Sequence, residues 1–201
     1  MEMYISGLGG LGLINLTKKV CFLLGQKYPR VLSSESRGIA QRRGSVSACV
    51  RAGENVFTPQ LYANQADVIV ALEALEALRQ PKLIKSGTVC IVSDMCVNNL
   101  GGAQGALRYP DFKEIVYTIS RLGGKVLVIP YAAMMQKDAL LKVHISSVCL
   151  AVTARLLGFS LQELQTFFPE LFTDAKNALA MHQGYELFSF EMAVEAERQV
   201  A

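Results

Sequence analysis

A glycine-rich segment directly after a short apolar run constrains the fold of this chain most strongly. The run 3–6 reads Met-Tyr-Ile-Ser, and the next six residues are Gly-Leu-Gly-Gly-Leu-Gly. Beyond it, Leu13, Leu16, Val20 and Leu24 recur at the spacing of an amphipathic helix. We therefore predict a strand, a glycine turn and a helix, which together are the opening unit of an α/β sheet domain.

Strand and helix patterns alternate along the chain to about residue 137. Nearly continuous apolar runs at 67–72, 88–92 and 126–129 are typical of strands buried in a parallel sheet. Beyond them only helical patterns follow. The predicted fold class is α/β: a three-layer, Rossmann-like sheet over 1–137 with a helical C-terminal segment over 138–201, the whole chain forming a single domain.

Local turn and capping signals predict the remaining elements. They are strands at 30–34 and 46–51, a turn at 53–55 with a return strand at 56–57, a helix at 73–79, a helix from Asp111 and its capping partner Glu114 to Gly123, a helix at 140–157, a capping box at Ser160, a helix from Pro169 and an amphipathic helix at 188–200.

Composition excludes several classes of protein. Of 201 residues, 51% are hydrophobic and 18% are charged, which excludes a disordered chain. No stretch approaches the ~18 apolar residues that a spanning helix needs, and no secretory signal is visible, so we expect no membrane association and a cytoplasmic location. The 20 basic and 17 acidic residues are too balanced to indicate a nucleic-acid surface. The apolar excess predicts a face for a partner, which we place on the helical segment after Asp138.

The five cysteines are an odd number, and none forms a C-x-x-C pair. We interpret them as free thiols in a reducing compartment, because zinc and iron–sulfur sites need clustered thiolates. The sequence also has no Ser/His/Asp set in a recognisable context, no thiamine-type Gly-Asp-Gly motif and no P-loop lysine. We therefore expect no catalytic residue and no metal ligand on this chain.

The glycine turn is the first candidate binding site. Gly7, Gly9, Gly10 and Gly12 allow a tight turn and the close approach of a phosphate to the free N–H groups that open the helix. A nucleotide-binding turn of this kind is expected to have an acidic residue for the ribose ~20 residues later. Glu35 lies near that position, but it leads into an arginine-rich loop, so the match is poor. A turn that only packs a helix against a sheet remains the alternative.

The arginine loop, residues 36–45, is the second candidate. Forked guanidinium donors between glycines and hydroxyls suit phosphate or carboxylate, and in a parallel sheet this loop would stand beside the glycine turn at the carboxyl edge. A solvated basic loop or a subunit contact would explain the same residues. The candidate ligands of the loop are Ser36, Arg37, Gln41, Arg42, Gly44 and Ser45.

The order of these motifs resembles a known family. The glycine turn, the string Gly-Ile-Ala-Gln-Arg-Arg-Gly-Ser-Val at 38–46, the strand Ala-Asp-Val-Ile-Val-Ala-Leu-Glu at 66–73 with Glu-Ala-Leu-Arg at 76–79, and Gly-Tyr-Glu at 184–186 are similar to the gamma subunit or domain of 2-oxoacid:ferredoxin oxidoreductases. The strongest resemblance is to the beta subunits of indolepyruvate oxidoreductases. Two residues depart from the usual pattern: Leu11 replaces a glutamine, and Arg43 replaces a glycine.

The resemblance implies an accessory subunit, inactive alone, of a complex that decarboxylates a 2-oxoacid, such as indolepyruvate or another aryl-pyruvate, to an acyl-CoA and passes electrons to ferredoxin. Thiamine diphosphate and iron–sulfur clusters are then expected on partner subunits, and coenzyme A at the glycine turn and the arginine loop. A second copy of the chain is a further expected partner. Two alternatives stay open: a stand-alone nucleotide-binding or assembly protein of the same fold, favoured by Leu11, and an NAD enzyme.

Overall fold

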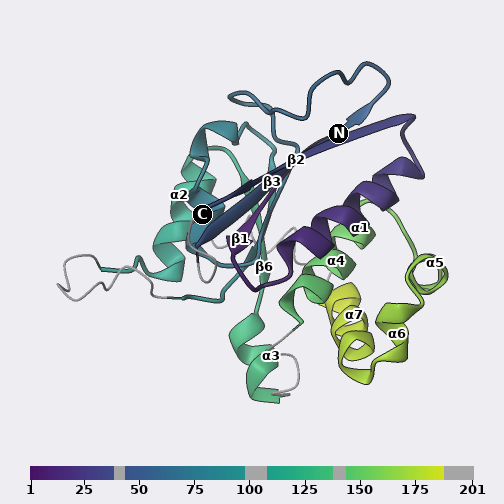
Figure 1. Cartoon of the computed structure of the whole chain (residues 1–201). Coiled ribbons are helices and arrows are strands. Elements are labelled where there is room, and N and C mark those ends of the chain that lie inside the picture. The colour runs from purple at the N-terminus through teal and green to yellow at the C-terminus, as the bar shows by residue number, and fades with distance from the viewer. Residues whose placement is uncertain (39–43, 98–107, 138–143, 188–201) are drawn as a thin grey trace.

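A six-stranded sheet forms the centre of the computed structural model, which describes residues 1–38, 44–97, 108–137 and 144–187 (Figure 1). Across the sheet the order is β2-β3-β1-β4-β5-β6. The strands are β1 (Glu2–Leu8), β2 (Arg30–Arg37), β3 (Ser45–Gly53), β4 (Val68–Ala71), β5 (Val89–Ser93) and β6 (Lys125–Ile129).

The sheet is mixed, not wholly parallel. Strands β1, β4, β5 and β6 are parallel, whereas β3 runs antiparallel to both of its neighbours, β1 and β2. Because β2 and β3 follow each other with only the arginine loop between them, they pair as a hairpin. β2 consequently points in the same direction as β1, so the loop still emerges at the carboxyl edge of the parallel strands.

Helices cover both faces of the sheet, which confirms the predicted three-layer α/β fold. On one face, α1 (Leu13–Gly25) and α4 (Ile145–Leu156) share an apolar core with β1 and β3, and α7 (Ala175–Leu187) packs on α4. On the other face, α2 (Phe112–Arg121) and the 3-10 turns η1 (Leu75–Leu78) and η2 (Pro81–Leu83) enclose a second core against β4 and β5. The remaining helices are α3 (Tyr131–Lys137), α5 (Leu161–Phe167) and α6 (Glu170–Thr173).

Capping signals located helix starts well. The Glu114 carboxylate accepts the backbone N–H of Asp111 at 2.7 Å where α2 begins, and Glu163 accepts that of Ser160 at 2.7 Å where α5 begins. Gly123, with a φ of +91°, ends α2 as predicted.

Other local predictions were wrong. Residues 56–57 form no strand, since both long edges of β3 are already paired. The helix predicted at 73–79 is only the 3-10 turn η1. α3 and α7 were not predicted as separate helices, and α4 begins at Ile145. The start of the helix predicted from residue 140 and the helix at 188–200 lie outside the described residues.

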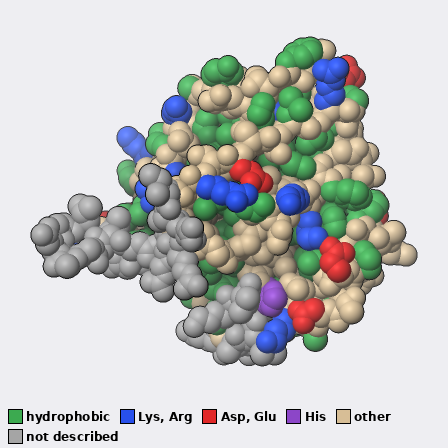
Figure 2. Space-filling model, in the orientation of Figure 1, with side chains coloured by type: hydrophobic (Ala, Val, Ile, Leu, Met, Phe, Trp, Pro, Cys, Tyr) green, Lys and Arg blue, Asp and Glu red, His purple; other side chains and the backbone are tan. Residues whose placement is uncertain are grey.

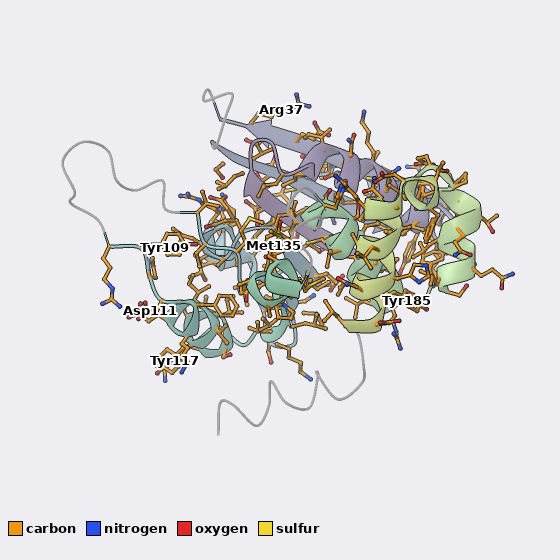
Figure 3. All side chains as sticks on the ribbon, turned by 90° about the horizontal axis from the view of Figure 1, so that it is seen from below. Arg37, Tyr109, Asp111, Tyr117, Met135 and Tyr185 are labelled. Atoms are coloured by element: carbon orange, nitrogen blue, oxygen red, sulfur yellow. The ribbon has the colours of Figure 1, made fainter. Side chains whose placement is uncertain are left out.

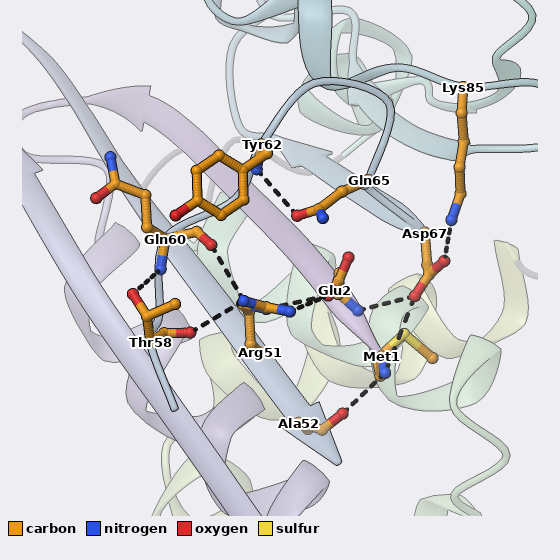
Figure 4. Close-up of polar contacts among 10 residues, drawn as sticks. All are labelled: Met1, Glu2, Arg51, Ala52, Thr58, Gln60, Tyr62, Gln65, Asp67 and Lys85. Atoms are coloured by element: carbon orange, nitrogen blue, oxygen red, sulfur yellow. Dashed lines mark hydrogen bonds and ion pairs between the residues drawn. The ribbon is translucent and has the colours of Figure 1, made fainter. Parts of the chain in front are cut away.

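A polar network secures the opposite, amino edge of the sheet (Figure 4). Arg51 on β3 donates through Nη2 to Glu2 at 2.7 Å and through Nη1 to the Thr58 carbonyl at 3.3 Å. Asp67 accepts the Glu2 backbone N–H at 2.8 Å and pairs with Lys85 at 2.6 Å. These contacts hold the connection between β3 and β4 against the sheet without a hairpin.

Within the described part of the chain, the large exposed apolar side chains do not lie on the C-terminal helices, where we expected the partner face; residues 138–143 and 188–201 of that segment lie outside the described residues. Figure 2 shows hydrophobic side chains spread over one face of the molecule. α4 is buried almost all round, because it lies between α1 and α7. The exposed side chains are Phe22, Phe57, Tyr62, Tyr117 and Leu122.

None of the described helices has the length and apolar character needed to cross a bilayer.

Candidate functional site

The glycine turn joins β1 to α1 at the carboxyl edge of the sheet. Gly10 and Gly12 adopt φ values of +97° and +83°, a left-handed conformation that favours glycine. Gly7 lies inside β1 and not in the turn, and a Cβ there would approach the Leu72 Cβ at 3.1 Å. α1 opens with no side-chain cap and no acidic side chain in its first turn, so its first N–H groups, which have no partner within a helix, can attract an anion.

The arginine loop ends beside this turn, as the sequence predicted, whereas its start lies one strand further away, because β3 separates β2 from β1. The Gly9 N–H donates to the Gly44 carbonyl at 2.8 Å, and the Gly38 N–H donates to the Ser45 carbonyl at 3.2 Å. The hairpin, rather than a parallel strand, brings the two segments together. The predicted ligands Gln41 and Arg42 lie outside the described residues, as does Arg43.

Arg37 belongs to the part of the arginine loop that the structure describes, and it stands at the end of β2 (Figure 3). Its side chain is 63% exposed, and its Nη2 pairs with the Glu35 carboxylate at 2.8 Å. Ser36 is exposed beside it. An exposed pair of this kind is weak, so an incoming phosphate can displace Glu35 at small cost.

Two buried carboxylates follow β4 at the same edge of the sheet, and their sequence pattern did not identify them as site residues. Glu76, 1% exposed, accepts the Ser45 hydroxyl at 2.6 Å through Oε2 and the Arg79 guanidinium at 2.7 Å through Oε1. The contact with Ser45 joins the turn after β4 to the end of the arginine loop.

Glu73, 2% exposed, is the second of these carboxylates. Its oxygens accept the Val97 N–H at 3.0 Å, the Glu76 N–H at 3.1 Å and the Tyr109 hydroxyl. Burial, reinforced by the hydrogen bond to Glu73, raises the pKa of Tyr109 above its usual range. The sequence signal was present: two acidic residues three apart directly after a continuous apolar strand.

Chemically, the arrangement suits an anion held by backbone N–H groups and a guanidinium. The starts of α1 and α4 lie close together at Gly12 and Ser146, since a Cβ on Gly12 would lie 2.7 Å from the Ser146 Oγ. Within the described ranges, no three His, Cys, Asp or Glu side chains group as a metal site would require. His144 precedes the first turn of α4, and His182 lies on α7.

Comparison with known proteins gives consistent matches. The sequence model of the family described as pyruvate ferredoxin/flavodoxin oxidoreductase matches residues 2–187. A relative from Thermococcus kodakarensis, named indolepyruvate oxidoreductase subunit IorB, is 28% identical over 165 residues, covering 82% of this chain and 81% of its own.

Solved structures share the fold. The gamma subunit of a keto/oxoacid ferredoxin oxidoreductase from Geobacter sulfurreducens aligns with a TM-score of 0.59 and 19% identity, covering 92% of this chain and 96% of its own. The 2-oxoglutarate:ferredoxin oxidoreductase from Magnetococcus marinus, solved with 2-oxoglutarate, coenzyme A and succinyl-CoA bound, aligns with a TM-score of 0.64 and 19% identity. That match covers 93% of this chain and 30% of the larger one.

Proposed function

Because this chain belongs to the pyruvate ferredoxin/flavodoxin oxidoreductase family, whose sequence model matches residues 2–187, we propose that it is an accessory subunit of a 2-oxoacid:ferredoxin oxidoreductase. The complex converts a 2-oxoacid and coenzyme A to an acyl-CoA and carbon dioxide and passes two electrons to ferredoxin. The name of the Thermococcus relative supports indolepyruvate, or another aryl-pyruvate, as the substrate. The family match over nearly the whole chain is the observation that carries the proposal.

Thiamine diphosphate and iron–sulfur clusters would be held by partner subunits, where they supply the decarboxylation and the electron transfer. This chain would contribute a binding surface for coenzyme A. A neighbour of the same fold was solved with coenzyme A bound. The described residues fit such a polyanion: α1 opens with no acidic side chain in its first turn, and Arg37 is exposed at the end of β2, at the same edge of the sheet.

Leu11 limits how the turn would work. Its side chain is partly buried against the core beneath α1, where the resemblance leads us to expect a glutamine. The Gly9 N–H is also taken by the Gly44 carbonyl. We propose that binding therefore depends on the first N–H groups of α1 and on the arginines, with no contribution from a side chain at residue 11.

A copurification experiment tests the subunit role. The chain, tagged at its C-terminus in its native cell, should recover a partner that carries thiamine diphosphate and iron–sulfur clusters, and the recovered complex should reduce ferredoxin with an aryl-pyruvate and coenzyme A. The chain alone should be inactive. Recovery of no such partner would contradict the proposal and favour a stand-alone protein of this fold.

Charge removal in the loop tests the coenzyme A surface. Arg37→Ala and Arg42→Ala should each raise the KM for coenzyme A by about tenfold, the effect of losing one charge-assisted hydrogen bond, and leave the KM for the 2-oxoacid unchanged. Arg30→Ala is the matched control, since it removes an exposed arginine from the far end of β2. Unchanged KM values in both loop variants would exclude this role.

A cytoplasmic location forms part of the same proposal. All five cysteines are free thiols in the structure, as a reducing compartment would keep them. Fractionation of the native cell, followed by immunodetection of the chain, tests the location directly, and recovery in a secreted fraction would contradict it.

A further inference from the structure

We propose that Glu76 is a positioning residue, whose buried carboxylate holds the end of the arginine loop in place through Ser45. The role in coenzyme A binding rests on the function proposed above. The anchoring itself rests only on described contacts: the Ser45 hydroxyl donates to Glu76 Oε2 at 2.6 Å, and both side chains are removed from bulk solvent to a large degree.

Glu76 is itself rigidly held. Its backbone N–H donates to Glu73 Oε2 at 3.1 Å, and its carbonyl accepts the hydroxyl of Ser6 on β1 at 2.9 Å. Its second carboxylate oxygen receives the Arg79 guanidinium at 2.7 Å. The anchor is therefore fixed to β1 and to the segment that follows β4, whereas the described end of the loop reaches it through the Ser45 hydroxyl.

The energetics make this contact a restraint on the loop. A carboxylate that is 1% exposed pays a large desolvation cost unless its oxygens are paired. Arg79 pairs with only one oxygen, so displacement of Ser45 leaves Oε2 without that donor. The neighbouring bond from Gly9 to the Gly44 carbonyl then aligns the same end of the loop with the glycine turn. Together these contacts set where Gly44 and Ser45 stand relative to the glycine turn that opens α1.

A purely structural role for Glu76, as a buried partner of Arg79, is the competing explanation. It predicts that changes at Ser45 act only through global stability. The two explanations differ in what happens locally at the loop, which the sequence allows us to follow because Arg42 and Arg43 are trypsin cleavage points.

Limited trypsin digestion of the full chain tests the anchor without any ligand or partner. Ser45→Ala should increase the rate of cleavage after Arg42 and Arg43 by about tenfold, the factor expected for losing a hydrogen bond to a charged group. Ser45→Thr keeps the hydroxyl and should stay within about twofold of the wild type. The fragment beginning at Gly44 is quantified by mass spectrometry.

Ser47→Ala is the matched control. It removes a second hydroxyl from β3, two residues along the strand from Ser45, which is the residue that donates to Glu76. Cleavage within about twofold of the wild type is expected for it. Equal acceleration in Ser45→Ala and Ser47→Ala, or no acceleration in Ser45→Ala, would overturn the anchor.

The reconstituted complex tests the role in binding. Ser45→Ala and Glu76→Gln should each raise the KM for coenzyme A by about threefold to tenfold at unchanged kcat, and the double variant should be no worse than the poorer single variant. Glu76→Gln separates positioning from direct contact, because Glu76 is buried beneath the loop. Unchanged KM values in both variants, or additive effects, would refute positioning.

The two experiments fail independently. If the activity of the wild-type complex does not depend on coenzyme A, the proposed function is contradicted. The digestion result would still decide whether Glu76 holds the end of the loop. Conversely, the complex could depend on coenzyme A while the Ser45→Ala chain alone is digested at the wild-type rate. That result would contradict the anchor and leave the proposed function intact.

Discussion

At Gly12 the backbone takes a conformation that an alanine would strain, and the space beside it is also filled. Its φ is +83°, and an added Cβ would lie 2.7 Å from the Ser146 Oγ and 3.1 Å from its Cβ. Gly12→Ala should therefore lower the free energy of unfolding by about 2–4 kcal/mol, the sum of left-handed strain and overpacking. Urea denaturation followed by circular dichroism measures the change.

Gly10 supplies the matched control for this residue. It shares the left-handed conformation, with a φ of +97°, but an added Cβ would meet no atom within 4 Å. Gly10→Ala should cost only the backbone strain of about 1–2 kcal/mol. If the two variants lose equal stability, close packing between the starts of α1 and α4 is not what requires Gly12.

At the scale of elements, the packing of α7 on α4 depends on one small residue. A Cβ on Gly184 would lie 2.7 Å from the Val148 carbonyl and 3.0 Å from the Ala151 Cβ, and backbone cannot move aside cheaply. Gly184→Ala should destabilise the protein by about 1–3 kcal/mol, measured by thermal unfolding. Gly25→Ala, in the last turn of α1 with open space around it, should be neutral or stabilising by up to about 1 kcal/mol. Equal destabilisation in the two would contradict close helix packing.

Elements were predictable where their signals are local. Side-chain caps fixed the starts of α2 and α5, and continuous apolar runs fixed β4 and β5. The direction of β3 was not predictable, because its alternating pattern is the same in parallel and antiparallel pairs. The helix expected at 73–79 shortens to a 3-10 turn because the Glu73 carboxylate takes the Glu76 N–H and Pro81 follows closely.

The candidate site was likewise predictable only in part from the sequence. Proximity of the glycine turn and the arginine loop followed from their places after β1 and β2, and the Gly9 to Gly44 bond confirms it. The buried roles of Glu73 and Glu76 did not follow, because their partners Tyr109 and Ser45 lie 36 and 31 residues away. A sequence pattern read over a short window gives no information on such partners.

At the scale of the whole molecule, the reactivity of the cysteine thiols measures how deeply each is buried and how readily it ionises. Cys96 is exposed, although partial burial raises its pKa as well, whereas Cys90 and Cys149 are buried, which raises the pKa of Cys90 to about 12 and that of Cys149 further still. Because the thiolate reacts, iodoacetamide should modify Cys96 first, and faster as the pH rises from 7 to 9. Cys90 and Cys149 should stay unmodified in the native protein. Their rapid modification, detected by peptide mass mapping, would contradict the two buried cores.

The same two thiols test whether the chain unfolds as one unit. Cys90 lies on β5 in the core beneath α2, and Cys149 lies on α4 in the core beneath α1, so they sit on opposite faces of the sheet. α4 packs on α1 and α7, which ties the helical segment to the first βα unit. In sub-denaturing urea both thiols should therefore become reactive at rates within about threefold, with one shared urea dependence, because only cooperative unfolding exposes either. Faster labelling of Cys149 with a weaker urea dependence would show that residues after 138 open alone, against the single domain predicted from the sequence.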